Sequence, residues 1–181
     1  MELIKNFKNN ILIKNLFLAI LGTILLTLSS KIKLPFWPVP MTMQTFVVLL
    51  IGVLYGWKLG VLTVSLYLIQ GLVGLPVFAG TPEKGLGLVY FTGPTMGYLI
   101  GFLVAVYLSG FFNYNNNFFK NFIKLVFSVS FIYLLGLIWL GFLIGWDKPI
   151  FKLGAQPFLL AELFKVLILA ILIPKISKLK I

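Results

Sequence analysis

The chain has 181 residues, of which 60% are hydrophobic and only 10% charged, and its mean hydropathy is +1.07. A water-soluble surface of ordinary charge density cannot be built from this composition, so most of the surface must face lipid. The net charge of +11 comes from 15 lysines against four acids, and the absence of His and Cys excludes the usual zinc, haem and iron–sulfur sites as well as thiol and imidazole catalysis.

The length bounds the number of membrane spans. A helix needs about 20 residues to cross about 30 Å of hydrocarbon, so a chain of 181 residues with short connections holds about six spans. No room remains for a second, soluble domain. We therefore expect residues 1–181 to form one transmembrane domain, an all-α integral membrane protein with six helices in a compact bundle.

The first half of the chain contains three predicted spans. Residues 16–30 follow three lysines, as a signal peptide would, but residues 28–30 are a poor cleavage site, so we expect this segment to stay as the first span. Residues 31–44 carry Pro35, Pro38 and Pro40, which predict a rigid extended loop with Phe36 and Trp37 at the membrane interface. Short helices follow at 45–55 and 59–73, with a tight turn at 56–58 between them.

The second half is predicted to contain three more spans. A Gly- and Pro-rich connection, 74–92, leads to a helix over 94–112 and a polar turn at 113–117. Residues 119–125 are an interfacial start to the fifth helix, which continues to residue 145. After a connection at 146–156, the last helix covers 157–173 and Pro174 closes it.

The lysines predict the orientation of the chain. Nine lie at the two termini and in the second and fourth connections, namely Lys5, Lys8, Lys14, Lys58, Lys120, Lys124, Lys175, Lys178 and Lys180. Five lie in the other three connections, namely Lys31, Lys33, Lys84, Lys148 and Lys152. Since the more basic side faces the cytoplasm, both termini are predicted to be cytoplasmic in a bacterial cell membrane. Lysines that flank apolar runs favour lipid headgroups and not nucleic acid as their partner.

The three predicted outside connections are long, rich in Gly and Pro, and apolar. An irregular backbone cannot face lipid because its polar groups would lack hydrogen bonds. We therefore expect these extracellular loops to fold over the helices and cap a ligand pocket that opens outward.

Glu162 and Lys165 are the most informative residues for function. An ionised side chain at a helix centre costs about 2.5–3.5 kcal/mol to insert, so both must be compensated or lie close to the interface. Their i, i+3 spacing places them on one face of the last helix. One interpretation is an intrahelical pair that only stabilises the bundle. The other is a recognition site, an acceptor and a cationic donor aimed at a small ligand under the outside loops.

Small residues indicate where helices approach one another. Gly97 and Gly101 are expected to serve helix packing. Ala19, Gly22 and Thr23 form a small-residue face on the first span, which is either the seat of another helix of this chain or a docking surface for a separate membrane protein.

Enzyme chemistry finds little support. The segment from Gly80 to Gly85 resembles a phosphate loop, but Leu86 stands where that motif needs Lys and no strand precedes it. Glu83 and Asp147 lie in different loops, so no paired carboxylates are apparent for acid–base work or metal binding. We expect no catalytic residue, no metal and no cofactor, and any ATP hydrolysis must occur on a partner.

Four motifs together resemble the BioY family, the substrate-capturing S components of energy-coupling-factor (ECF) biotin transporters. They are PVPMTMQTF at 38–46, GLPVFAG at 74–80, GPTMGYLIGF at 93–102 and PFLLAELFK at 157–165. The resemblance extends over nearly the whole chain, in the family's order.

The resemblance implies a function and a site. It implies a six-helix protein that binds biotin from outside and works with a transmembrane T component and two cytoplasmic ATPases. Carried onto matching positions, it makes Glu162 and Lys165 the main ligand-binding candidates, followed by Phe78, Gly80 and Tyr98.

The sequence departs from the family pattern at one point, where Ala161-Glu162 replaces Gly-Asp. Glutamate keeps the charge but moves the carboxylate oxygens by about one bond length, which would weaken binding or admit a relative of biotin. The alternatives to a biotin-capture subunit are thus an S component for a related vitamin and a membrane structural or assembly protein.

Overall fold

The computed structural model describes residues 11–35 and 41–176, and these ranges are mainly helical. The long elements are α2 (Ile11–Lys31), α3 (Gln44–Leu72), α5 (Met96–Phe111), α6 (Phe118–Ile144) and α8 (Leu159–Ile176). The short ones are β1 (Lys33–Leu34), β2 (Met41–Thr42), α4 (Leu88–Phe91), α7 (Ile150–Gly154) and the 3₁₀ turn η1 (Gln156–Phe158). The two strands pair antiparallel, Lys33 opposite Thr42 and Leu34 opposite Met41.

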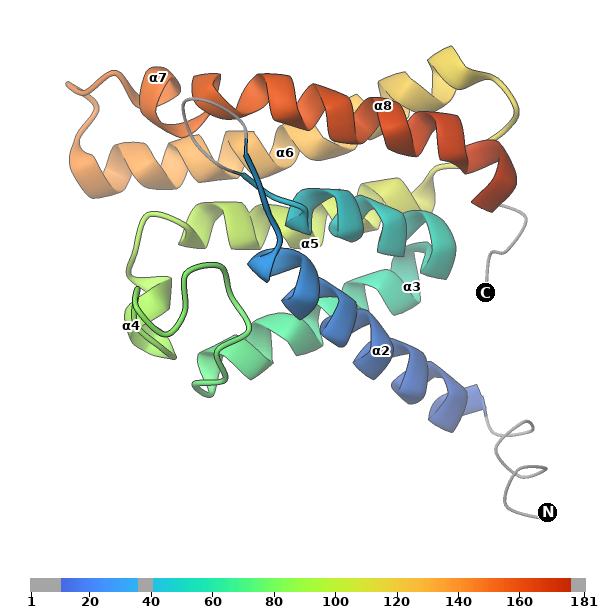
Figure 1. Ribbon diagram of the computed structural model, residues 1–181, viewed down its shortest axis with the longest axis horizontal. Helices are drawn as coiled ribbons and strands as arrows, with labels where there is room; N and C mark the ends of the chain where they lie inside the picture. Colours follow the sequence, from blue (N-terminus) through green and yellow to red (C-terminus); the bar gives the residue numbers. More distant parts are fainter. Residues whose placement is uncertain (1–10, 36–40, 177–181) are drawn as a thin grey trace.

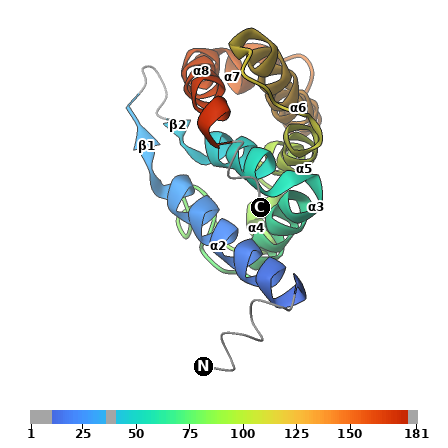
Figure 2. The same ribbon diagram turned by 90° about the vertical axis from the view of Figure 1, so that its right-hand side faces the viewer.

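The long helices pack in a defined order. α8 lies beside α6, α6 packs on α5, α5 packs on α3, and α3 carries α2 on its far side (Figure 1). Viewed from the end, α2 lies at the edge of the bundle away from α6 and α8, and β1 lies on the side of α2 (Figure 2). The buried core is therefore centred on α3 and α5, while α2 is peripheral.

A bend at Gly56 divides α3 into two halves. Its φ of 70° and ψ of 175° interrupt the helical backbone, and a positive φ of this size is readily adopted only by glycine. The halves 44–55 and 57–72 correspond to the two short helices predicted from the sequence, with the predicted turn at 56–58 reduced to this one residue.

Many apolar side chains are exposed and some charged ones are buried, as in a protein embedded in a lipid bilayer. Within residues 11–35 and 41–176, four helical segments are long and apolar enough to cross a membrane, Ile11–Lys31, Gln44–Leu72, Phe118–Ile144 and Ile150–Ile176, and the shorter Met96–Phe111 is also apolar. On α8, Leu160, Phe164 and Ile171 are more than half exposed, whereas Glu162 and Lys165 are buried. A helix of a water-soluble protein would bury such apolar side chains and expose such charged ones.

The structure differs from the sequence-based expectations mainly at element ends. The first helix is longer than predicted and begins by residue 11, α4 and α7 are short helices inside connections predicted to be irregular, and α8 continues past Pro174 to Ile176. Proline is tolerated there because it removes only one hydrogen bond in the final turn. Several predicted features lie outside the described residues, namely Lys5, Lys8, Phe36, Trp37, Pro38, Pro40, Lys178 and Lys180.

The glycines of α5 serve helix packing, as expected. A Cβ built on Gly101 would lie 2.6 Å from the Cα of Ile132, and one on Gly97 would overlap the Leu135 carbonyl and the Trp139 side chain, both on α6. These glycines let α5 and α6 approach backbone to backbone.

Replacing Gly101 with Val should therefore destabilise the bundle by at least about 2 kcal/mol, because the new side chain meets backbone atoms that cannot move aside. Thermal unfolding in mild detergent measures the effect, and Ile100→Val, at the neighbouring exposed position, is the control. Equal stability of the two variants would show that the α5–α6 approach is looser than described here.

Candidate functional site

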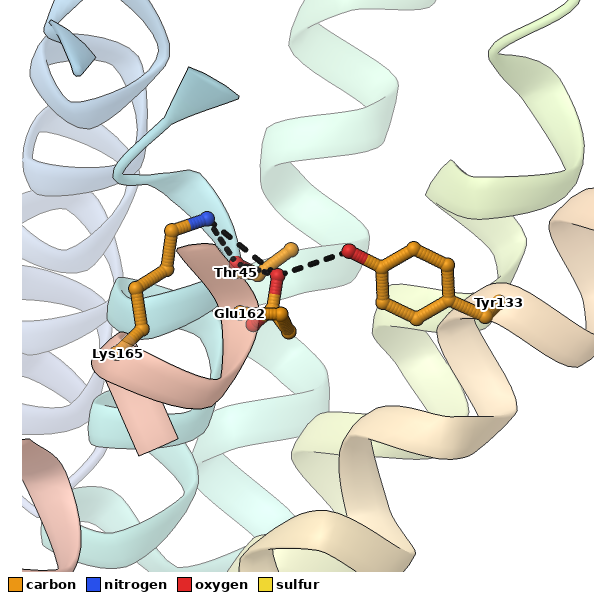
Figure 3. Close-up of polar contacts among 4 residues, drawn as sticks. All are labelled: Thr45, Tyr133, Glu162 and Lys165. Carbon is orange, nitrogen blue, oxygen red and sulfur yellow. Dashed lines mark hydrogen bonds and ion pairs between the residues drawn. The ribbon is translucent and has the colours of Figure 1, made fainter. Parts of the chain in front are cut away.

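Glu162 and Lys165 lie at the centre of a buried polar network formed by three helices (Figure 3). The Lys165 Nζ lies 3.4 Å from Glu162 Oε2 on α8 and donates a hydrogen bond of 2.9 Å to the Thr45 hydroxyl on α3. Thr45 and Tyr133, the latter on α6, each donate a hydrogen bond of 3.0 Å to the same carboxylate oxygen. One carboxylate oxygen thus joins α3, α6 and α8.

The second oxygen of Glu162 has a different environment. Among the described residues, Oε1 is buried and accepts no hydrogen bond. A carboxylate oxygen accepts hydrogen bonds readily, and leaving one without a donor in an apolar interior is costly. Among the described residues this acceptor is therefore unsatisfied, although Glu162 as a whole is only 4% exposed.

A cavity of about 420 Å³ lies next to the network, and Thr45 and Tyr133 belong to both. Its apolar lining consists of Met41, Ala79, Leu99, Phe102, Ile132 and Phe158. Its remaining lining residues are Lys33, Thr42, Gln44, Thr45, Gly80, Lys84, Tyr90, Thr95, Tyr98 and Tyr133. Because the rings of Tyr90, Tyr98 and Tyr133 add to the apolar residues, the cavity combines apolar walls with hydroxyl, amide and ammonium groups, which together with its volume is typical of small-molecule sites.

The residues predicted from the sequence occupy three kinds of place. Gly80 and Tyr98 line the cavity. Glu162 and Lys165 lie behind the lining, hydrogen-bonded to Thr45, and are 4% and 2% exposed. Phe78 is not among the lining residues; it is 1% exposed.

Phe78 instead belongs to the core that supports the loop over the cavity. Its ring stacks on Tyr90 and meets Tyr67 and Phe91 edge to face. The Tyr67 hydroxyl donates to the carbonyl of Val77 and accepts from the side chain of Gln44, which itself lines the cavity. These contacts connect the loop that follows α3 to the start of the same helix.

Tyr90 and Tyr98 hold the rim of the cavity. The Tyr90 hydroxyl donates to the carbonyl of Ala79 over 2.9 Å, and burial raises the pKa of Tyr90, so this group remains a neutral donor. The Tyr98 hydroxyl donates to the carbonyl of Gly154 over 2.7 Å, while its ring meets that of Tyr133 edge to face.

The small-residue face of α2 lies against α3. Ala19, Gly22 and Thr23 are all buried, and a Cβ on Gly22 would lie 2.5 Å from a methyl carbon of Thr63. The three residues therefore form a seat for a helix of this chain in this conformation and are not an open docking surface.

Sequence reasoning missed most of the polar lining. Thr42, Gln44 and Thr45 lie within the 38–46 motif, so the motif itself was a signal that these residues have a specific role. Tyr133 gave no local signal, because a single tyrosine in an apolar span is equally compatible with packing or with an interfacial position.

The buried pair makes a prediction that is independent of any ligand. Lys165→Met leaves an uncompensated carboxylate in the bundle and should cost about 3 kcal/mol of stability, whereas adding Glu162→Gln should recover at least about half of that loss. Thermal unfolding of the two single variants and the double variant measures this coupling. Strictly additive losses would mean that the two charges do not compensate each other.

Comparison with known proteins identifies the family to which the chain belongs. A sequence model of the BioY family matches residues 4–180. A probable biotin transporter BioY of Pyrococcus horikoshii is 35% identical, covering 84% of this chain and 89% of its own, and a biotin transporter BioY of Thermotoga maritima is 32% identical, covering 93% and 98%. The crystal structure of an S component for biotin from an ECF-type ABC transporter superposes with a TM-score of 0.74 at 28% identity, covering 92% of each chain. The chain described here therefore belongs to the BioY family.

Proposed function

We propose that this protein is the biotin-capturing S component of an ECF-type transporter. Family membership, the names of the relatives and the solved S component support this function. The single observation in the structure that carries it is the cavity of about 420 Å³ lined by Thr45 and Tyr133, whose hydroxyl groups are hydrogen-bonded to the buried pair Glu162 and Lys165.

The chemistry of the cavity suits biotin. The ureido ring of biotin presents two N–H donors and a carbonyl, its fused rings are apolar, and its tail ends in a carboxylate. Thr45 and Tyr133 line the cavity and donate their hydroxyl hydrogens to Glu162, so their oxygens would accept from the ureido N–H groups. Lys33 and Lys84 are exposed lining residues, so the carboxylate would face outward towards them.

The proposal extends to the arrangement of the helices and connections in the membrane. Six spans are supplied by α2, the two halves of α3, α5, α6 and α8, and the β1–β2 ribbon and the 74–92 and 146–156 connections lie outside the cell. Lysines concentrate at the opposite ends of the helices, which makes the termini cytoplasmic by the positive-inside rule. The cavity then opens towards the exterior of a bacterial cell membrane, where a vitamin would be captured.

Energy for release would come from other subunits. The family is one of transporter S components and not of enzymes. No nucleotide-binding motif is recognisable in the sequence, so we propose that a transmembrane T component and two cytoplasmic ATPases complete the transporter, and that the chain carries no cofactor or metal of its own.

Purified protein in nanodiscs should bind labelled biotin saturably, and Lys165→Ala should weaken binding about a hundredfold, because the carboxylate and Thr45 lose their partner. Lys152→Ala, at an exposed position on α7, is the matched control. An isotherm against a panel of vitamins identifies the ligand. Absence of saturable binding, with loss of folded yield in the variant, would favour the membrane structural or assembly protein, and tighter binding of a relative of biotin would favour an S component for that vitamin.

The outward lysines predict a preference for a charged tail. Wild-type protein should bind biotin at least about tenfold more tightly than biotin methyl ester, and the double variant Lys33→Gln, Lys84→Gln should lose that preference. Competition against labelled biotin gives both affinities. An undiminished preference in the double variant would place the carboxylate elsewhere in the cavity.

A further inference from the structure

The loop that follows α3 is held by side chains of other elements at several successive carbonyls. The Val77 carbonyl accepts from Ser30 and from Tyr67, each over 2.8 Å, and the Ala79 carbonyl accepts from Tyr90. The backbone here is irregular, with positive φ at Gly80 and Gly85, so no helix or sheet ladder fixes its position. The loop depends on these external donors for its place.

Lys31 is the one cation that holds this loop within the described residues. It is the last residue of α2, and its Nζ donates to the carbonyls of Phe78 and Thr81 over 2.9 and 3.0 Å, and to the Thr81 hydroxyl over 3.0 Å. Hydrogen bonds from an ammonium group are about twice as strong as those between neutral groups. A single side chain thus fixes both ends of the 78–81 segment.

The held segment forms part of the cavity wall. Ala79 and Gly80 line the cavity, and Lys84, whose amide donates to the Gly80 carbonyl over 2.9 Å, lines it as well. Lys31 itself is not among the lining residues. It therefore acts on the wall from behind, without reaching the space that a ligand would occupy.

α2 is placed so that its position and that of the loop are linked. It packs against α3, with a smaller contact to β2, and it lies at one edge of the bundle (Figure 2). Its carboxyl end is bonded to the loop through both Ser30 and Lys31. A tilt of α2 away from α3 would therefore pull the loop from the cavity or break these bonds.

We propose that Lys31 is a positioning residue that keeps the 78–81 segment closed over the cavity and makes this closure depend on the seating of α2 against α3. The inference rests on the proposed function only in that the cavity is taken to hold biotin. Its chemical basis is the replacement of a missing backbone ladder by three bonds from one ammonium group.

The experiment compares Lys31→Met, which keeps the chain length without donors, with Lys31→Arg, which keeps a cation with several donors, and with Lys14→Met, at an exposed position on the same helix. Hydrogen exchange is measured in ligand-free protein at the amides of Thr81, Lys84 and Gly85, all of which donate within the loop. The dissociation rate of labelled biotin is measured in parallel. Lys31→Met should raise both rates about tenfold, while Lys31→Arg and Lys14→Met stay within about threefold of wild type.

Unchanged loop exchange in Lys31→Met would overturn the inference, and so would faster biotin dissociation without faster loop exchange, because the effect would then not pass through the loop. If wild-type protein binds no biotin, the proposed function fails, and the exchange measurement alone decides the role of Lys31. If Lys31→Met does not fold, Thr81→Val removes one of the three acceptors, and an exchange rate in the loop equal to that of wild type would overturn the inference.

Discussion

The structure depends on one requirement, that the charges of Glu162 and Lys165 be compensated inside an apolar bundle. Neither group can be left alone in such surroundings, and the pair alone does not satisfy all of their donors and acceptors. Thr45 from α3 and Tyr133 from α6 supply the missing partners, so the carboxylate on α8 fixes the relative positions of three helices. Glu162 and Lys165 thus hold the bundle together, and this is compatible with a role in ligand recognition because one Glu162 carboxylate oxygen remains without a donor among the described residues.

The cavity follows from the same arrangement. Thr45 and Tyr133 are hydrogen-bonded to the buried pair and also line the cavity, so they place hydroxyl groups beside the apolar side chains of its wall. Glu162 and Lys165 are therefore not exposed to the cavity, which differs from the sequence-based expectation. They are hydrogen-bonded to the hydroxyl groups of two cavity-lining residues, Thr45 and Tyr133, and are themselves nearly excluded from solvent.

Much of the bundle could be predicted from the sequence, because apolar runs, glycine spacing and flanking lysines are local signals. The bend at Gly56 and the close approach at Gly101 follow such signals. The site was harder to predict because its contacts are distant in sequence: Thr45 and Glu162 are 117 positions apart. Phe78 was expected to touch the ligand, yet its buried ring supports the loop from the core. An apolar stretch such as 75–79 does not reveal from its sequence which side chains face the core and which face a cavity. The Gly- and Pro-rich composition predicted an irregular connection after α3, but its attachment through Lys31 depends on a contact that no motif encodes.

The most direct test of the central claim is an experimental structure of the protein with biotin bound. Density for the ligand should lie in the cavity between the 78–84 loop and Thr45, with the ureido ring towards Thr45 and Tyr133 and the carboxylate towards Lys33 and Lys84. Density at another place, or a cavity filled by side chains while Glu162 and Lys165 keep only each other as partners, would contradict it.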